Sequence, residues 1–209
     1  MNSNIIIDAL PYSVTIDGDE VEINTDFRSM MITEMLILNP EISKEDKVAQ
    51  VFYNFYGENI PVWNLDESAK KFLWFYLCGE PEEAERRASG SSGRIKRIYD
   101  FEYDAPLIYA AFLSQYGIDL QEIEYLHWWK FKAMFNSLRN SLFVEVMQCR
   151  AVKITKNMGK EQKAYYQRMK DLYRLPDGKN VTESKKEKEL IAALQSGDVS
   201  AVESLKRGG

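Results

Sequence analysis

Histidine and cysteine are scarce in this sequence. Among its 209 residues there is one histidine, His127, and there are two cysteines, Cys78 and Cys149, each inside an apolar helical pattern. A single histidine excludes a histidine-rich metal site, and zinc held by one histidine and two distant cysteines would be an unusual arrangement. A disulfide framework needs more cysteines in a smaller secreted chain. We therefore expect two buried, reduced thiols, no bound metal and no cofactor.

Long apolar runs and phosphate-binding loops are also missing. The first apolar run, Ile5–Ile7, is short and has no basic flank, so it does not resemble a signal peptide. No apolar run approaches the roughly 20 residues that cross a bilayer. The segment Gly90–Gly93 lacks the lysine and the preceding strand of a phosphate loop. The sequence thus predicts a cytoplasmic protein with neither a membrane partner nor a small-molecule substrate.

Basic residues are outnumbered by acidic ones, 27 to 32, which gives a formal net charge of −5. This balance predicts no nucleic-acid partner, because proteins that bind nucleic acids normally carry a basic surface. One basic segment, interleaved with Tyr165 and Tyr166, could contact nucleic acid, but a solvated helix face is the favoured interpretation. Its basic residues are Lys153, Lys156, Lys160, Lys163, Arg168 and Lys170.

Local patterns predict a β-hairpin followed by helices. Two alternating runs, 12–16 and 21–25, flank Asp17-Gly18, and an Asp-Gly pair favours a tight hairpin turn. Apolar residues then recur at helical spacing, and Ser43 lies three positions before Asp46, which is close to a capping box. Helices are predicted at 28–38, 43–57, 65–78, 141–150 and 160–173.

The segment at 100–135 is predicted to be the centre of the core, as a helix, a short turn and a second helix. Gly117 fits the C-terminus of the first helix, and Asp119 can cap the second, which carries Leu126 and Trp129 on one face. Each fully buried large apolar side chain of such a pair contributes about 1.5–3 kcal/mol. Everything else in the chain should pack on this pair.

These patterns predict a mainly α fold with a small N-terminal β-hairpin. Residues 79–95 change to charged residues and then to glycine and serine, so we expect a flexible internal loop. Residues 1–178 are interpreted as one helical domain. Residues 179–209 are interpreted as a charged appendage with short, weakly packed helices.

Two features are candidates for function. The stretch Phe72–Leu77 is apolar on most sides, which indicates either a central helix or a surface that binds a partner. His127 precedes Trp128 and Trp129, and the favoured interpretation is a structural histidine bonded to a backbone group. The alternative is a general base acting with Asp100, Asp104 or Glu124. The acidic residues at 100–104, 119 and 122 fit helix N-termini better than a metal site.

Several linked motifs over residues 8–178 resemble one protein family. The N-terminal motifs are Leu10–Val14, Ile16–Gly18 and Thr25–Arg28. The central block comprises Asp100–Asp104, Ile108–Phe112, Gln115–Leu120 and Leu126–Phe131. The C-terminal signature consists of Tyr165-Tyr166 and Leu172–Pro176. Together they resemble the bacteriophage gp-fifteen (Gp15) family of siphophages and prophages of Gram-positive bacteria.

The resemblance implies a role in phage tail assembly. Genes of this family typically lie between those for the major tail protein and the tape-measure protein, where tail assembly chaperones are usually encoded. It therefore implies a non-catalytic protein in the cytoplasm of the infected host cell. Such a chaperone binds the tape-measure protein, recruits tail-tube protein and can form a homo-oligomer. The alternatives are a structural virion component, in the tail or the head–tail connector, and a small enzyme that uses His127.

If the chain is such a chaperone, two groups of apolar residues are predicted to bind its partners. They are Phe72, Trp74 and Phe75 in one helix, and Met30, Met31 and Met35 in another. Methionine side chains adapt to varied partner surfaces. We expect these side chains to be partly exposed and to contact a tape-measure helix, and the hypothesis fails if they are buried. His127, Trp128 and Trp129 are signature positions of the family.

Overall fold

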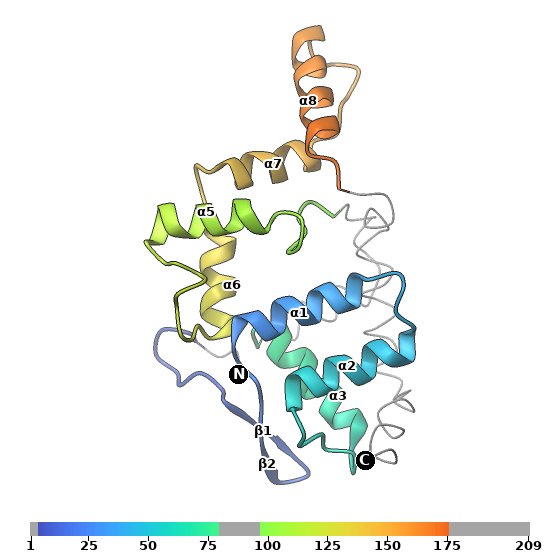
Figure 1. Ribbon diagram of the computed structural model, residues 1–209, viewed down its shortest axis with the longest axis vertical. Coiled ribbons are helices and arrows are strands. Elements are labelled where there is room, and N and C mark those ends of the chain that lie inside the picture. The colour runs from blue at the N-terminus through green and yellow to red at the C-terminus, as the bar shows by residue number, and fades with distance from the viewer. Residues whose placement is uncertain (1–3, 80–96, 176–209) are drawn as a thin grey trace.

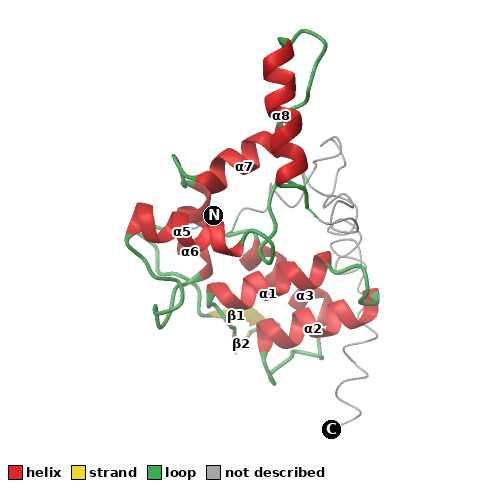
Figure 2. Cartoon of the chain, turned by 45° about the horizontal axis from the view of Figure 1, so that its top comes forward, coloured by secondary structure: helices red, strands yellow, loops and turns green. Residues whose placement is uncertain are grey.

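The computed structural model describes residues 4–79 and 97–175, and within them the fold is mainly α, as predicted. Figure 1 shows a small β-hairpin at one end, a helical body, and a helix that projects at the other end. Figure 2 shows the same arrangement coloured by secondary structure. The elements are β1 Ser13–Ile16, β2 Asp19–Glu22, α1 Phe27–Leu38, α2 Lys44–Tyr56, α3 Leu65–Tyr76, α5 Ala105–Tyr116, α6 Trp128–Asn136, α7 Leu142–Ala151 and α8 Lys160–Leu172.

The predicted hairpin is confirmed, with its turn at Asp17-Gly18. Val14 pairs with Val21 and Ile16 with Asp19 in the antiparallel register. Asp17 and Gly18 both have positive φ, +52° and +93°, as a two-residue hairpin turn requires. Asn64 donates from its side-chain amide to the Asp17 carboxylate at 2.9 Å, which ties the turn to the start of α3. The apolar face of the hairpin is therefore held against the helices.

Helices α2, α3 and α7 each begin directly after a residue whose side chain caps the helix. Ser43 accepts a hydrogen bond from the Asp46 amide at the start of α2, and Ser141 accepts one from Val144 at the start of α7. Asn64 caps α3 in the same way. Each side chain satisfies a backbone amide that the helix itself leaves without an acceptor. Gly117 ends α5 in the left-handed conformation, as predicted.

The prediction that the second helix of the central pair starts near Asp119 is wrong. Asp119 accepts hydrogen bonds from the amides of Gln121 and Glu122 in a short turn, and from the Tyr109 hydroxyl of α5 at 2.8 Å. Helix α6 begins only at Trp128. The intervening segment forms a turn at 120–122, and its last residues then pair with the start of α1. Phe27 donates its amide to the Leu126 carbonyl at 2.9 Å, and Trp128 donates to the Thr25 carbonyl at 2.8 Å. These long-range backbone bonds replace the helix that local periodicity favoured.

Helix α6 contributes the centre of the hydrophobic core. Phe131 is fully buried between Phe27 and Phe112, with ring centroids 4.9 and 5.0 Å away. The indole nitrogens of Trp128 and Trp129 donate to the carbonyls of Tyr76 and Phe75 at the end of α3. Burying a tryptophan requires such an acceptor, so these two bonds fix α6 to α3.

One hydrophobic core cluster of the described residues has members from Val14 to Phe143, and the interpretation of residues 1–178 as one domain stays a prediction. Of the predicted flexible loop, residues 80–95 lie outside the described residues, as does the whole predicted appendage at 179–209. Within 4–79 and 97–175, no helix combines the length and the apolar character needed to cross a membrane.

Candidate interaction surfaces and a buried charge cluster

Three of the six predicted partner-binding residues belong to the core. Met30, Phe72 and Phe75 are fully buried. Phe55 packs against both phenylalanines of α3, with ring centroids 5.3 Å away in each case. The expectation that these three side chains form a partly exposed contact surface is therefore wrong. The apolar stretch of α3 marks a central helix, which was the other interpretation of the sequence.

The remaining three predicted contact residues are half-buried. Met31, Met35 and Trp74 pack against the core cluster. Trp74 lies edge-on to Trp129, with ring centroids 5.4 Å apart. A role for these three side chains in partner binding stays a prediction.

His127 has a structural role at the junction of α1 and α6. Its Nδ1 accepts a hydrogen bond from the Trp129 amide at 3.1 Å, which caps α6, and its Nε2 lies 3.0 Å from the Pro11 carbonyl. A carbonyl accepts hydrogen bonds, so Nε2 carries the proton and the ring is neutral. Burial lowers the pKa of His127 below its usual 6.5, against the opposing effect of the Pro11 carbonyl. With both ring nitrogens engaged, His127 is not placed to act as a general base.

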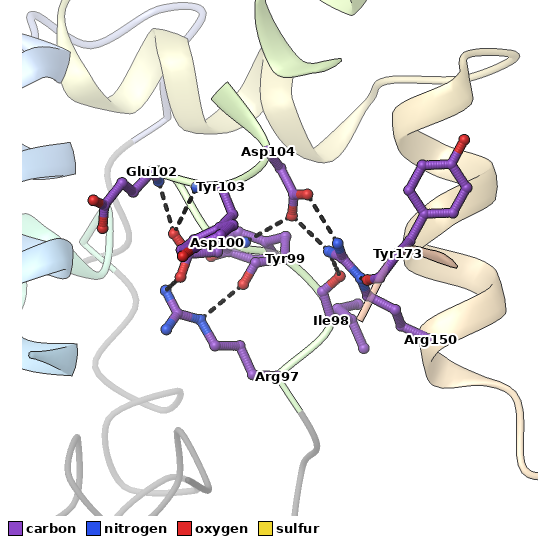
Figure 3. Close-up of polar contacts among 9 residues, drawn as sticks. All are labelled: Arg97, Ile98, Tyr99, Asp100, Glu102, Tyr103, Asp104, Arg150 and Tyr173. Atoms are coloured by element: carbon purple, nitrogen blue, oxygen red, sulfur yellow. Dashed lines mark hydrogen bonds and ion pairs between the residues drawn. The ribbon is translucent and has the colours of Figure 1, made fainter. Parts of the chain in front are cut away.

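A buried ion-pair cluster contains Asp100 and Asp104, two of the three carboxylates that the sequence offers as partners of a catalytic His127 (Figure 3). The third, Glu124, is exposed. Arg150 of α7 binds Asp104 with two nitrogens, at 2.6 and 2.9 Å. Arg97 binds Asp100 at 3.0 Å. Asp100 donates its backbone amide to Asp104 at 2.9 Å, which joins the two pairs. All four side chains are at most 8% exposed.

The cluster holds three chain segments together. Arg150 donates further hydrogen bonds to the carbonyls of Ile98 and Tyr173, at 3.0 and 2.8 Å (Figure 3). Its own carbonyl accepts a bond from Lys170 of α8 at 2.9 Å. Arg150 therefore connects the segment before α5, helix α7 and the end of α8. Sequence reasoning missed this cluster, because Arg150 and Asp104 are far apart in the chain and the other buried residues of α7 are apolar.

Three exposed apolar surfaces of the described residues were not predicted from the sequence to bind a protein partner. The first is the isoleucine turn, Ile5–Ile7, in which Ile6 and Ile7 are 87% and 78% exposed. The turn is ordered by its flanks: the Ile7 and Asp8 amides donate to the Asn4 carbonyl, and the Asn4 amide donates to the Asp8 carboxylate. Exposed large aliphatic side chains on a hydrogen-bonded turn are available to a partner.

The second surface is a groove between α1 and α2 with a volume of 690 Å³. Its apolar lining comes from Ile32, Leu36, Ala49, Tyr53 and Ile60, and its polar lining from Asp46, Gln50, Asn54, Gly57 and Glu58. Ile32 and Tyr53 are half-exposed. The groove is thus apolar at its base and carries two acidic side chains.

The third surface is α8, which projects from the body (Figure 1). It has no buried residue, although its sequence is amphipathic. Tyr165 is 45% and Leu172 is 69% exposed. These residues are seven positions apart, so they share one face of the helix with Arg168 between them.

Among the described residues no group of three or more histidine, cysteine or acidic side chains is arranged to hold a metal ion. The family described as "Bacteriophage Gp15 protein" matches residues 6–175 of the chain. No curated protein and no solved structure matches the sequence.

Proposed function

We propose, from the premise that this chain belongs to the bacteriophage Gp15 protein family, that it is a non-catalytic tail assembly chaperone of the infected cell's cytoplasm. The match over residues 6–175 covers most of the chain, and it makes the protein a phage structural or morphogenesis protein. The finer proposal is that it binds the tape-measure protein and helps recruit tail-tube subunits. The observation that carries it is the family match.

The isoleucine turn supports the proposal, because a chaperone must present apolar surface to its client. Ile6 and Ile7 are the most exposed large aliphatic side chains of the described residues. They lie on a turn that the Asn4 and Asp8 hydrogen bonds hold in place, so binding would cost little backbone ordering. We place the tape-measure contact on this turn.

General-base catalysis by His127 with Asp100 or Asp104 is not supported, because these side chains form structural contacts. His127 caps α6 and donates to the Pro11 carbonyl. Asp100 and Asp104 bind arginines inside the protein. The non-catalytic proposal is consistent with these assignments.

Co-expression with the tape-measure protein of the same phage tests the proposal. We expect the tape-measure protein to become soluble and to co-purify with many copies of this chain. Ile6→Asp should abolish the co-purification, because an aspartate in the apolar contact loses its hydration. Leu113→Asp is the matched control, since Leu113 is an exposed aliphatic residue of α5 outside the turn. A tape-measure protein that stays insoluble with the unaltered chain would contradict the proposal.

A structural virion component is the second candidate, because the family match supports it equally. Analysis of purified phage particles distinguishes the chaperone from the virion component. A chaperone leaves before the particle is complete, whereas a tail or connector component is present in fixed copy number. Detection of the chain in purified virions at such a number would favour the second candidate.

A further inference from the structure

We infer that copies of this chain assemble head to tail, with α8 of one copy bound in the α1–α2 groove of the next. Both surfaces are apolar and exposed, and they lie toward opposite ends of the molecule's long axis (Figure 1). This inference concerns the chain alone and does not rest on the proposed function.

The first half of the contact is a basic arm, residues 152–175, that includes α8. It contains seven basic and two acidic residues, a net charge of +5, in a chain whose total is −5. The rest of the chain therefore carries −10. Along α8, Tyr165, Arg168 and Leu172 form one exposed stripe, with an aromatic ring, a cation and an aliphatic chain in succession. A helix with such a stripe is suited to an apolar groove with acidic side chains.

The second half of the contact is the groove. Its ten lining residues include Asp46 and Glu58 and no basic residue. Tyr53 is 57% and Ile32 is 50% exposed, so both still have apolar surface to cover. Its apolar base fits Tyr165 and Leu172, and its acidic residues fit Arg168. The two surfaces of one chain are thus complementary in both hydrophobicity and charge.

The arrangement favours contact between copies. Helix α8 is held to α7 by Lys170, which donates to the Arg150 carbonyl, and by Tyr165, which interacts with the Cys149 side chain while its ring stays 45% exposed. Figure 1 places α8 away from α1 and α2. A contact between two different surfaces on identical chains is heterologous, so it repeats and gives a ring or an open filament. Because charge contributes to the contact, the assembly should weaken as salt screens it.

Sedimentation of the full-length chain tests the inference. We expect species larger than a dimer that grow with protein concentration and dissociate as salt is raised. Arg168→Glu and Glu58→Lys should each shift the chain toward a monomer, because each replaces an attractive charge pair at the contact by two charges of the same sign. Lys130→Glu and Glu122→Lys are the controls, since they make the same charge changes at exposed sites away from both surfaces. The controls should assemble like the unaltered chain.

The most specific test is a mixture of the Arg168→Glu and Glu58→Lys variants. In the mixture the Arg168→Glu stripe meets the Glu58→Lys groove with the charge pair reversed, and an unaltered stripe meets an unaltered groove. We therefore expect assembly to return, with the two variants alternating. A chain that is monomeric at every concentration would overturn the inference, as would a groove found to be filled by the chain's own residues 176–209. Variants that assemble alone, or a mixture that stays monomeric, would overturn it as well.

Discussion

The guanidinium of Arg150 and the carboxylate of Asp104 form a two-point ion pair, at 2.6 and 2.9 Å, between residues 46 positions apart. Neither residue is exposed by more than 8%. Each partner is the main compensation for the other's loss of hydration. The pair therefore helps to hold α7, and with it the projecting α8, against the segment before α5.

Replacement of Arg150 by methionine should destabilise the fold strongly. Removing one partner leaves a buried carboxylate without its counter-ion, which costs about 3–5 kcal/mol. Urea unfolding followed by circular dichroism measures this loss. Lys71→Met is the matched control, because Lys71 pairs with Glu67 at the surface, where such a pair contributes about 0.3–0.5 kcal/mol. Equal losses for the two variants would contradict the assigned role.

A double variant tests whether Arg150 and Asp104 stabilise the fold as a pair. Arg150→Met together with Asp104→Leu removes both charges, so it should recover much of the stability that Arg150→Met loses. The same urea series measures the coupling. If the double variant loses the sum of the two single losses, the residues do not act as a pair.

His127 should make the protein less stable in mildly acidic solution. Its pKa in the folded state lies below the usual 6.5, chiefly because it is buried, so the unfolded chain binds a proton first as pH falls. The contribution of neutral His127 to the free energy of unfolding is therefore fully present above about pH 6.5. Below that pH the free energy of unfolding falls, by at most about 1.4 kcal/mol per pH unit for one proton. Unfolding free energies at about pH 7.5 and 5.5 measure the slope. His127→Gln should remove that slope, and an unchanged slope would contradict the assignment.

Phe72 should behave as a core residue and not as a contact residue. Phe72→Ala removes a fully buried ring beside Phe55, and such truncations cost about 3–5 kcal/mol. Ile6→Ala is the comparison, because Ile6 is 87% exposed and surface substitutions usually change stability by less than about 0.5 kcal/mol. Thermal unfolding of the two variants should separate them clearly. Similar melting temperatures would contradict the burial of Phe72.

Local signals in the sequence predicted most elements of the fold. The Asp17-Gly18 turn, the Ser43 cap and the Gly117 terminus each depend on neighbouring residues, so each could be predicted without the tertiary structure. The start of α6 could not. It depends on backbone bonds that pair Thr25 with Trp128 and Phe27 with Leu126, and no local pattern records them.

The candidate surfaces were harder to predict than the fold. Phe72 and Phe75 lie in a stretch that is apolar on most sides, and periodicity cannot tell a buried helix from an exposed apolar one. The Arg150–Asp104 pair could not be predicted because it joins distant segments. The isoleucine turn could be seen as a short apolar run, but its exposure follows from the fold around it.

The most direct test of the chaperone proposal is the copy number of this chain in two purified samples. Multi-angle light scattering of the co-expressed complex with the tape-measure protein gives one number, and mass spectrometry of purified virions gives the other. The proposal predicts many copies per tape-measure chain in the complex and none in the virion. A chain that is absent from the complex, or retained in the virion at fixed copy number, would contradict it.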